Sequence, residues 1–187
     1  MPFRRTLSIA LWCIGTIAVS CTDKSTNPQQ YTSARSMLLT DNEISGWKAD
    51  TSTYPTGWNF MPDTIALMNM IDGMYALYAR QGWKNGIVQT MESSSALFYQ
   101  GDVFDFGTET NATQMYQVQK DAHGSGIDSM RGFSKSVAFG SSVLGGGMIF
   151  AHKTNLYFEL AFTGFDSTAS AYDTGRVFLK KFFSKIP

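Results

Sequence analysis

Both cysteines of this 187-residue chain, Cys13 and Cys21, lie within its first 21 residues. From residue 22 onward the chain therefore offers no disulfide, no cysteine ligand for a metal and no cysteine nucleophile. A domain in that part must be stable without disulfides. Because about 150 residues can bury roughly 70% of their unfolded surface, one core is sufficient.

The charges of the chain balance, with 15 Lys and Arg against 15 Asp and Glu and a formal net charge of zero. Charged residues make up 16% of the chain and aromatic residues 14%, which excludes an intrinsically disordered chain. With this balance the chain has no net excess of basic residues of the kind that binds nucleic acid. We therefore expect no nucleic-acid partner.

The first 20 residues have the pattern of an export signal. Arg4 and Arg5 precede an uncharged apolar run over residues 7–19, which is too short for a bilayer-spanning helix. The segment Ala18-Val19-Ser20-Cys21 resembles the bacterial lipobox. The resemblance implies that residues 1–20 are a lipoprotein signal peptide, cut before a cysteine that is then acylated. The alternative is a secreted protein in which Cys21 is incidental.

Lipidation of Cys21 would place the rest of the chain at a membrane surface. Two or three acyl chains hold a protein on a bilayer durably, so these chains would be its contact with the membrane. Residues 21–36 are polar and contain Pro28, which predicts a flexible tether before a single domain over residues 37–187. Thr22 is not the aspartate associated with inner-membrane retention. We therefore expect the outer membrane, with the domain in the periplasm or at the cell surface.

The patterning after residue 60 alternates between helix and strand. Pro62 and Asp63 predict a helix that continues to about Arg80, Thr108 begins a second helix to about Lys120, and Asp166 begins a third. Strands are predicted over residues 87–91, 96–106, 136–140, 147–152 and 156–162, with Asn85 and Gly86 as a turn. Short turns between strands favour antiparallel pairing. The prediction is an α+β fold, with a single twisted, mainly antiparallel sheet and about three helices packed against it.

Helical spacing also predicts which side chains are buried. In the first helix the stripe is Leu67, Ile71, Met74, Tyr75 and Tyr78, and the cost of Gly73 suggests a close contact between helix and sheet. In the last helix the stripe is Ala171, Gly175, Phe178, Leu179, Phe182 and Ile186. The lysines near its end, Lys180, Lys181 and Lys185, are interpreted as solvated capping charges.

Two motifs resemble an uncharacterised family of bacterial exported domains. One covers residues 38–47 and ends in Gly46-Trp47, and the other is Ile71-Asp72-Gly73, followed by Tyr residues and Gly82-Trp83. The resemblance spans about residues 37–186. It implies export and a domain of unknown function, and it supplies no catalytic residues.

The sequence shows no known catalytic or cofactor-binding pattern. His123 and His152 have no nearby ligand at metal-binding spacing, so no metal is expected. Gly140-Ser141-Ser142-Val143-Leu144 lacks the last glycine of a nucleophile elbow. Asp102 and Asp105 are an odd number of residues apart on a strand, so we expect them on opposite faces. We predict no catalytic residue and no cofactor.

The candidate ligand-binding residues are one acid and four aromatic residues. Asp72 lies on a sparsely charged helix, where it either caps a neighbouring loop or lines a pocket. The aromatic residues flank the first helix and could present stacking faces or simply cover the edge of the sheet. They are Trp47, Tyr54, Trp58 and Trp83.

Three functions remain open on this basis. The leading hypothesis is a lipid-anchored envelope protein with a non-catalytic domain that binds a small-molecule ligand or another envelope protein. The second is an envelope hydrolase whose site is assembled only in three dimensions. The third is a structural or assembly lipoprotein of an envelope machine.

Overall fold

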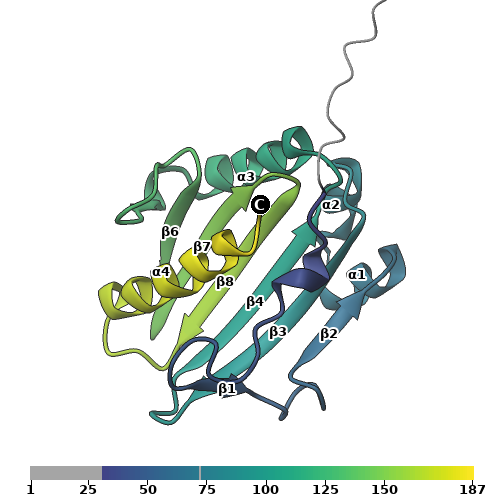
Figure 1. Ribbon diagram of the computed structural model, residues 1–187. Coiled ribbons are helices and arrows are strands. Elements are labelled where there is room, and N and C mark those ends of the chain that lie inside the picture. The colour runs from purple at the N-terminus through teal and green to yellow at the C-terminus, as the bar shows by residue number, and fades with distance from the viewer. Residues whose placement is uncertain (1–30, 72) are drawn as a thin grey trace, which may run out of the picture.

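Eight strands form one open sheet in the computed structural model, which describes residues 31–71 and 73–187. The strand order is β1-β3-β4-β8-β7-β6-β5, with β2 also paired to β3, and every pairing is antiparallel. Figure 1 shows the sheet face-on. The strands are β1 (Trp47–Ala49), β2 (Trp58–Met61), β3 (Asn85–Ser93), β4 (Phe98–Asp105), β5 (Asp128–Ser129), β6 (Ala138–Val143), β7 (Gly146–Lys153) and β8 (Leu156–Thr163).

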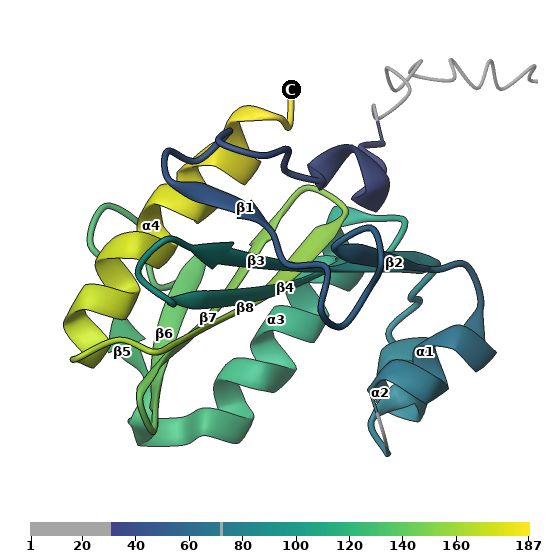
Figure 2. The ribbon, with the colours of Figure 1, turned by 90° about the horizontal axis from the view of Figure 1, so that it is seen from below.

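Helices cover both faces of this sheet (Figure 2). On one face lie α4 (Thr168–Ser184) and the 3-10 helix η1 (Ala34–Met37). On the other lie α1 (Thr64–Met70), α2 (Tyr75–Arg80) and α3 (Glu109–His123), which runs into the short η2 (Gly124–Gly126). The predicted α+β fold is confirmed. Within the described residues, no helix is both long and apolar enough to cross a membrane.

The α4 face of the sheet holds the larger part of the core. All six residues of the predicted stripe on this C-terminal helix are buried. Gly175 is needed there because a β-carbon at this position would lie 2.1 Å from the Ile149 side chain and 2.7 Å from Phe162. The capping residue is one position later than predicted, because the Ser167 hydroxyl, and not Asp166, caps the helix by accepting from the Ser170 amide.

The α3 face holds a second core of aromatic residues. Phe104 and Phe106 of the β4 segment pack there with Tyr157 of β8 and with Tyr78 of α2. Thr108 caps α3 as predicted, with its hydroxyl accepting from the Asn111 amide. The two faces of β4 are therefore both covered, as its sequence indicates.

The predicted helix over residues 62–80 is wrong in one respect, because it is two short helices. Asp63 caps α1 as expected, but the helix ends at Met70, and Gly73 has φ of +74°. A β-carbon on Gly73 would have no neighbour within 4 Å, so no close contact with the sheet explains this glycine. The break also turns Met74 outward, where it is 43% exposed.

The aromatic segment before α1, where the sequence predicts no strand, contains two short strands. Residues 47–49 and 58–61 both pair with β3 at the same edge of the sheet. Such short edge strands have few side chains, so the alternation of apolar and polar residues is too brief to recognise in the sequence. The predicted turn at Asn85 and Gly86 is wrong as well, since both residues pair with β4.

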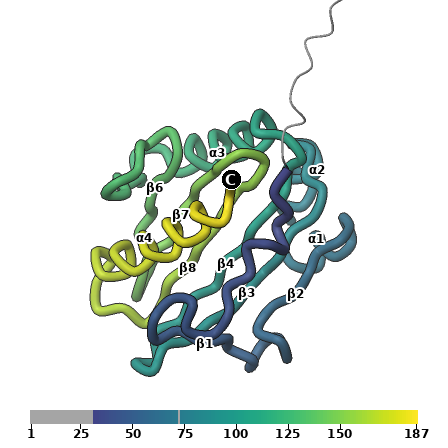
Figure 3. Tube along the Cα trace, in the orientation of Figure 1, coloured from purple at the N-terminus to yellow at the C-terminus, as the bar shows by residue number. Residues whose placement is uncertain are grey.

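The first described residues are packed against the α4 face (Figure 3). The side chain of Asn155 bonds both backbone groups of Thr32, at 3.2 Å to the amide and 2.9 Å to the carbonyl, and Ala34 is buried. This segment belongs to the expected tether, 21–36. From residue 32 onward, then, the expected tether is part of the packed structure.

Glu43 joins this segment to the end of α4. Its carboxylate pairs with Lys185 at 2.9 Å and Lys181 at 3.3 Å, and Lys185 also donates to the Leu38 carbonyl at 2.6 Å. Burial alone would raise the pKa of Glu43, but the Thr40 amide and the two lysines lower it to about 2. The interpretation of these two lysines as solvated caps is therefore wrong. Only Lys180 of the three is exposed.

Candidate functional site

Two carboxylates lie directly opposite each other on the α3 face of the sheet. Asp102 of β4 is the register partner of Glu159 of β8. Directly opposed side chains on antiparallel strands have β-carbons about 4.5–5.5 Å apart, and like charges at that position repel. Asp105 lies on the opposite face, as predicted, where it accepts from Asn155 at 2.7 Å.

Glu159 is held by hydrogen bonds from three elements. Its Oε1 atom accepts from the Tyr78 hydroxyl of α2, from the Tyr157 hydroxyl of β8 at 2.9 Å and from the Gln119 amide of α3 at 3.4 Å. All three donors are themselves buried. The side chain of Glu159 is therefore fixed in place. The Asp102 carboxylate accepts one long hydrogen bond within the described part of the chain, from the Gln100 amide at 3.5 Å.

No lysine or arginine of the described residues pairs with these two carboxylates. Among residues 31–71 and 73–187, the ion pairs involve neither Asp102 nor Glu159. Burial and the neighbouring Glu159 charge raise the pKa of Asp102 to about 8. Burial also raises the pKa of Glu159, although hydrogen bonds from Tyr78 and Tyr157 and the nearby His123 oppose the rise. The two carboxyl groups therefore retain a proton near neutral pH.

The pair lies where the α3-side core opens to solvent. Beyond it on the same face of β4, Gln100 is exposed and Phe98 is 43% exposed. Asp102 and Glu159 are themselves half-buried. The Tyr54 hydroxyl contacts the Met70 sulfur at 3.3 Å, and burial together with the Asp102 charge raises the pKa of this hydroxyl. We call Asp102, Glu159, Tyr54, Tyr78 and Tyr157 the acidic site.

The predicted aromatic candidates do not gather at one point. Trp47 is buried against Phe178 in the α4-face core, whereas Trp83 is buried in the α3-face core. The Arg35 guanidinium lies over the ring of Trp58, with its Cζ atom 5.0 Å from the ring centre. Tyr54 lies on the side of the α3-face core, where its hydroxyl contacts the Met70 sulfur at 3.3 Å. Asp72 lies outside the described residues.

The two histidines have local structural contacts. His152 contacts the Ser136 carbonyl at 2.8 Å and the Thr113 hydroxyl at 3.3 Å. His123 contacts the Gln119 carbonyl at 2.8 Å. Within the described part of the chain, no three histidine, cysteine or acidic side chains are grouped to hold a metal ion.

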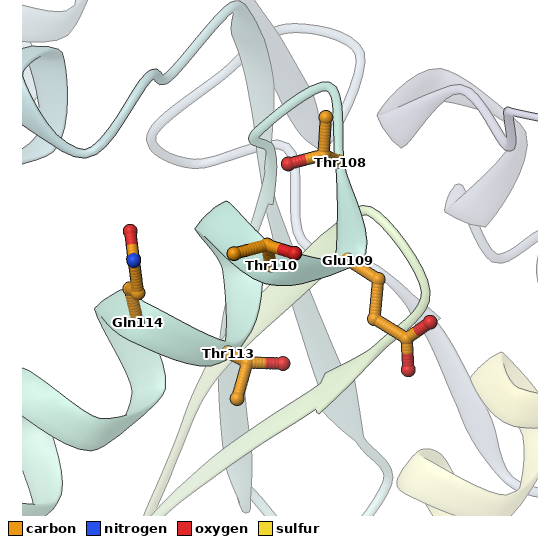
Figure 4. A pocket seen from close by; sticks show the side chains of 5 residues that line it. All are labelled: Thr108, Glu109, Thr110, Thr113 and Gln114. Atoms are coloured by element: carbon orange, nitrogen blue, oxygen red, sulfur yellow. The ribbon is translucent and has the colours of Figure 1, made fainter.

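A surface hollow of about 730 Å³ lies elsewhere, at the start of α3. Figure 4 shows its lining, which comes from the first turns of this one helix. The labelled side chains point in different directions and do not converge on a common point. We therefore place the candidate site at the carboxylate pair, where groups from several elements do converge.

Sequence reasoning missed Glu159, although one signal was present. Glu159 is the only charged residue in the apolar stretch from Leu156 to Phe162, a strand that is covered on both faces. A lone acid in such a strand is costly to bury and marks a functional candidate. In the sequence Asp102 has an obvious acidic neighbour in Asp105. That its strand pairs with the strand that carries Glu159 is visible only in the structure.

The raised pKa of Asp102 predicts how stability depends on pH. Below about pH 4 the carboxyl is protonated in both states, and between about pH 4 and 8 only the folded state keeps the proton. Unfolding then releases a proton, so the free energy of unfolding should fall as the pH rises through this window. In the Asp102→Asn protein the free energy of unfolding should fall less between pH 5 and pH 8.5. Urea unfolding at these two pH values measures the difference.

The matched control for this experiment is Asp166→Asn, which removes an exposed carboxylate from the loop before α4. It should retain the wild-type pH dependence. An Asp102→Asn protein with the same slope as the wild type would contradict the raised pKa.

One solved structure supports the fold of this domain. No family model and no curated protein matches the chain. The crystal structure of the extracellular domain of PknH from Mycobacterium tuberculosis matches with a TM-score of 0.55 and 10% identity, over 84% of this chain and 98% of that one. The chain shares the fold of that extracellular domain. A structural match at 10% identity shows a shared fold and assigns no site residue to this chain.

Proposed function

We propose that this protein is a lipid-anchored protein of the bacterial cell envelope whose domain binds a small cationic ligand, without catalysis, at the acidic site. Export is supported by the signal-like pattern of residues 1–20 and by the fold shared with an extracellular domain. The anchor is supported by the lipobox-like Ala18-Val19-Ser20-Cys21. Membership of the exported domain family suggested by the Gly46-Trp47 and Ile71-Asp72-Gly73 motifs is part of the same proposal.

The observation that carries the binding proposal is the carboxylate pair, which has no ion-pair partner within residues 31–71 and 73–187. Asp102 and Glu159 oppose each other at the solvent boundary, and they avoid full repulsion by keeping a proton. An ammonium or guanidinium group would supply the missing positive charge. The ring of Tyr54, which is partly exposed, could add cation–π attraction worth about 0.5–2 kcal/mol, whereas the rings of Tyr78 and Tyr157 are buried. A protonated amine is therefore the ligand class that fits this site.

The experiment is calorimetric titration of the full-length processed protein, in non-ionic detergent, with 1,4-diaminobutane and with agmatine. We expect binding at pH 7 to release protons, because the cation displaces the proton held by the pair. The release appears as a dependence of the binding enthalpy on the ionisation enthalpy of the buffer. Asp102→Asn should weaken binding at least tenfold, whereas Asp166→Asn should not.

Two results would overturn the proposal. One is unchanged affinity of both amines for the Asp102→Asn protein. The other is absence of binding by both amines to a wild-type protein that is folded by circular dichroism.

A hydrolase is the second candidate function, and the same pair favours it. A protonated carboxyl beside an ionised one is one arrangement that acid–base hydrolysis uses. Against this, three hydrogen bonds already engage Oε1 of Glu159. Turnover of p-nitrophenyl glycosides or peptide substrates that Asp102→Asn abolishes would favour the hydrolase over the binding domain.

A further inference from the structure

We infer that Arg131, Arg176 and Lys180 form a second binding site, which takes a phosphate-type oxyanion. The three residues, with Gly132, line a hollow of about 290 Å³. Arg131 follows β5 in the chain, whereas Arg176 and Lys180 are one turn apart on α4. Residues four apart project from the same side of a helix, so two elements present cations to one space.

The charge balance of this hollow is positive. Arg176 pairs with Asp173 at 3.1 Å, but that carboxylate is 70% exposed at the side chain. Within residues 31–71 and 73–187, neither Arg131 nor Lys180 forms an ion pair. Further along the same helix, Lys181 and Lys185 are both neutralised by Glu43. Three cations against one exposed carboxylate therefore leave this hollow with a positive charge.

The loop that carries Arg131 is held in place on both sides. Met130 is buried in the α4-face core, and Phe133 packs edge-on against Phe183 with ring centres 5.6 Å apart. The Tyr172 hydroxyl of α4 also donates to Asp128 of β5 at 2.8 Å. Because these contacts fix the loop against α4, the backbone that carries Arg131 is in place beside α4 before any anion arrives.

The donor set fits a tetrahedral oxyanion. Two guanidinium groups can each present a pair of parallel N–H donors to oxygen atoms, and a lysine adds a compact charge. Donors from two elements can reach different oxygens of one phosphate. The phosphate could be free in solution or belong to the headgroup of an anionic lipid.

The acidic site and this hollow lie on opposite faces of the sheet. Figure 2 shows α4, which carries Arg176 and Lys180, across the sheet from α3. The anion site therefore does not depend on the proposed amine ligand. Either site can be tested while the other remains intact.

The test measures thermal unfolding of the full-length processed protein in non-ionic detergent. Sodium phosphate at about 20 mM should raise Tm by about 3 °C over sodium chloride of equal ionic strength, since a bound ligand stabilises the folded state. Arg131→Gln/Lys180→Gln changes two exposed side chains and should weaken phosphate binding at least tenfold. The matched control, Arg80→Gln/Lys84→Gln, removes two exposed cations near α2 and should respond like the wild type.

A second arm distinguishes the two sources of phosphate. Mixed micelles of the detergent with phosphatidylglycerol are compared with micelles that contain phosphatidylcholine. A rise in Tm with phosphatidylglycerol alone that the double variant loses assigns the site to a lipid headgroup, and a rise with inorganic phosphate assigns it to a soluble anion. No rise with either probe, or an equal rise in the wild type and the Arg131→Gln/Lys180→Gln protein, overturns the inference.

Discussion

Replacing Phe178 with alanine is expected to lower the free energy of unfolding by about 4 kcal/mol, the range for a large side chain lost from a packed core. Phe178 is fully buried on α4. Its ring centre lies 4.4 Å from that of Tyr99, 5.1 Å from Trp47 and 5.3 Å from Phe162. Those neighbours come from β4, β1 and β8, so one truncation leaves a cavity where several elements meet. The measurement is equilibrium unfolding in urea.

The control is the next residue of the same helix. Val177 is 50% exposed, so Val177→Ala removes apolar atoms from α4 without opening a cavity. We expect a change within about 0.5 kcal/mol, as for most surface substitutions. A Phe178→Ala protein that loses less than 1 kcal/mol would contradict the packing of α4 against the sheet.

Cys21→Ala is expected to move the protein from the membrane fraction to the soluble fraction of the envelope. Cys21 lies outside the described residues, so this prediction depends on the lipobox resemblance alone. Each buried methylene of an acyl chain contributes about 0.8 kcal/mol to membrane attachment, and loss of the chains removes all of it. The change should be made behind a secretory leader that the ordinary signal peptidase cleaves, so that an uncut leader does not retain the chain.

Cys13→Ala is the matched control, because it alters only the predicted leader and leaves Cys21 for acylation. That protein should stay in the membrane fraction and incorporate labelled palmitate. If the Cys21→Ala protein remains on membranes after a high-salt wash, the lipid-anchor proposal is wrong.

Local sequence patterns predicted the elements that carry their own signals. The stripe from Ala171 to Ile186 was predicted completely, because a long amphipathic helix repeats its signal over several turns. The break at Gly73 was not predicted, since a single glycine within a helical pattern is compatible with either a helix or its end. The edge strands β1 and β2 were too short to show a period.

Glu43 illustrates a second limit of local patterns. The sequence places it in the segment that ends in Gly46-Trp47, with no indication of its partners. In the folded chain it pairs with Lys181 and Lys185, which are about 140 residues away. Such a contact depends on where the C-terminal helix docks, and helix patterning does not carry that information.

The sequence by itself determined the class of fold, the cysteine-free domain and the export-like leader, because periodicity and composition are properties of consecutive residues. Only the tertiary structure placed Glu159 opposite Asp102 and brought Arg131 beside α4. The physical reason is that strand register and helix docking are decided by the packing of whole faces. A one-residue shift of β8 against β4 would turn Glu159 toward the other core, and no local pattern in either strand specifies that register.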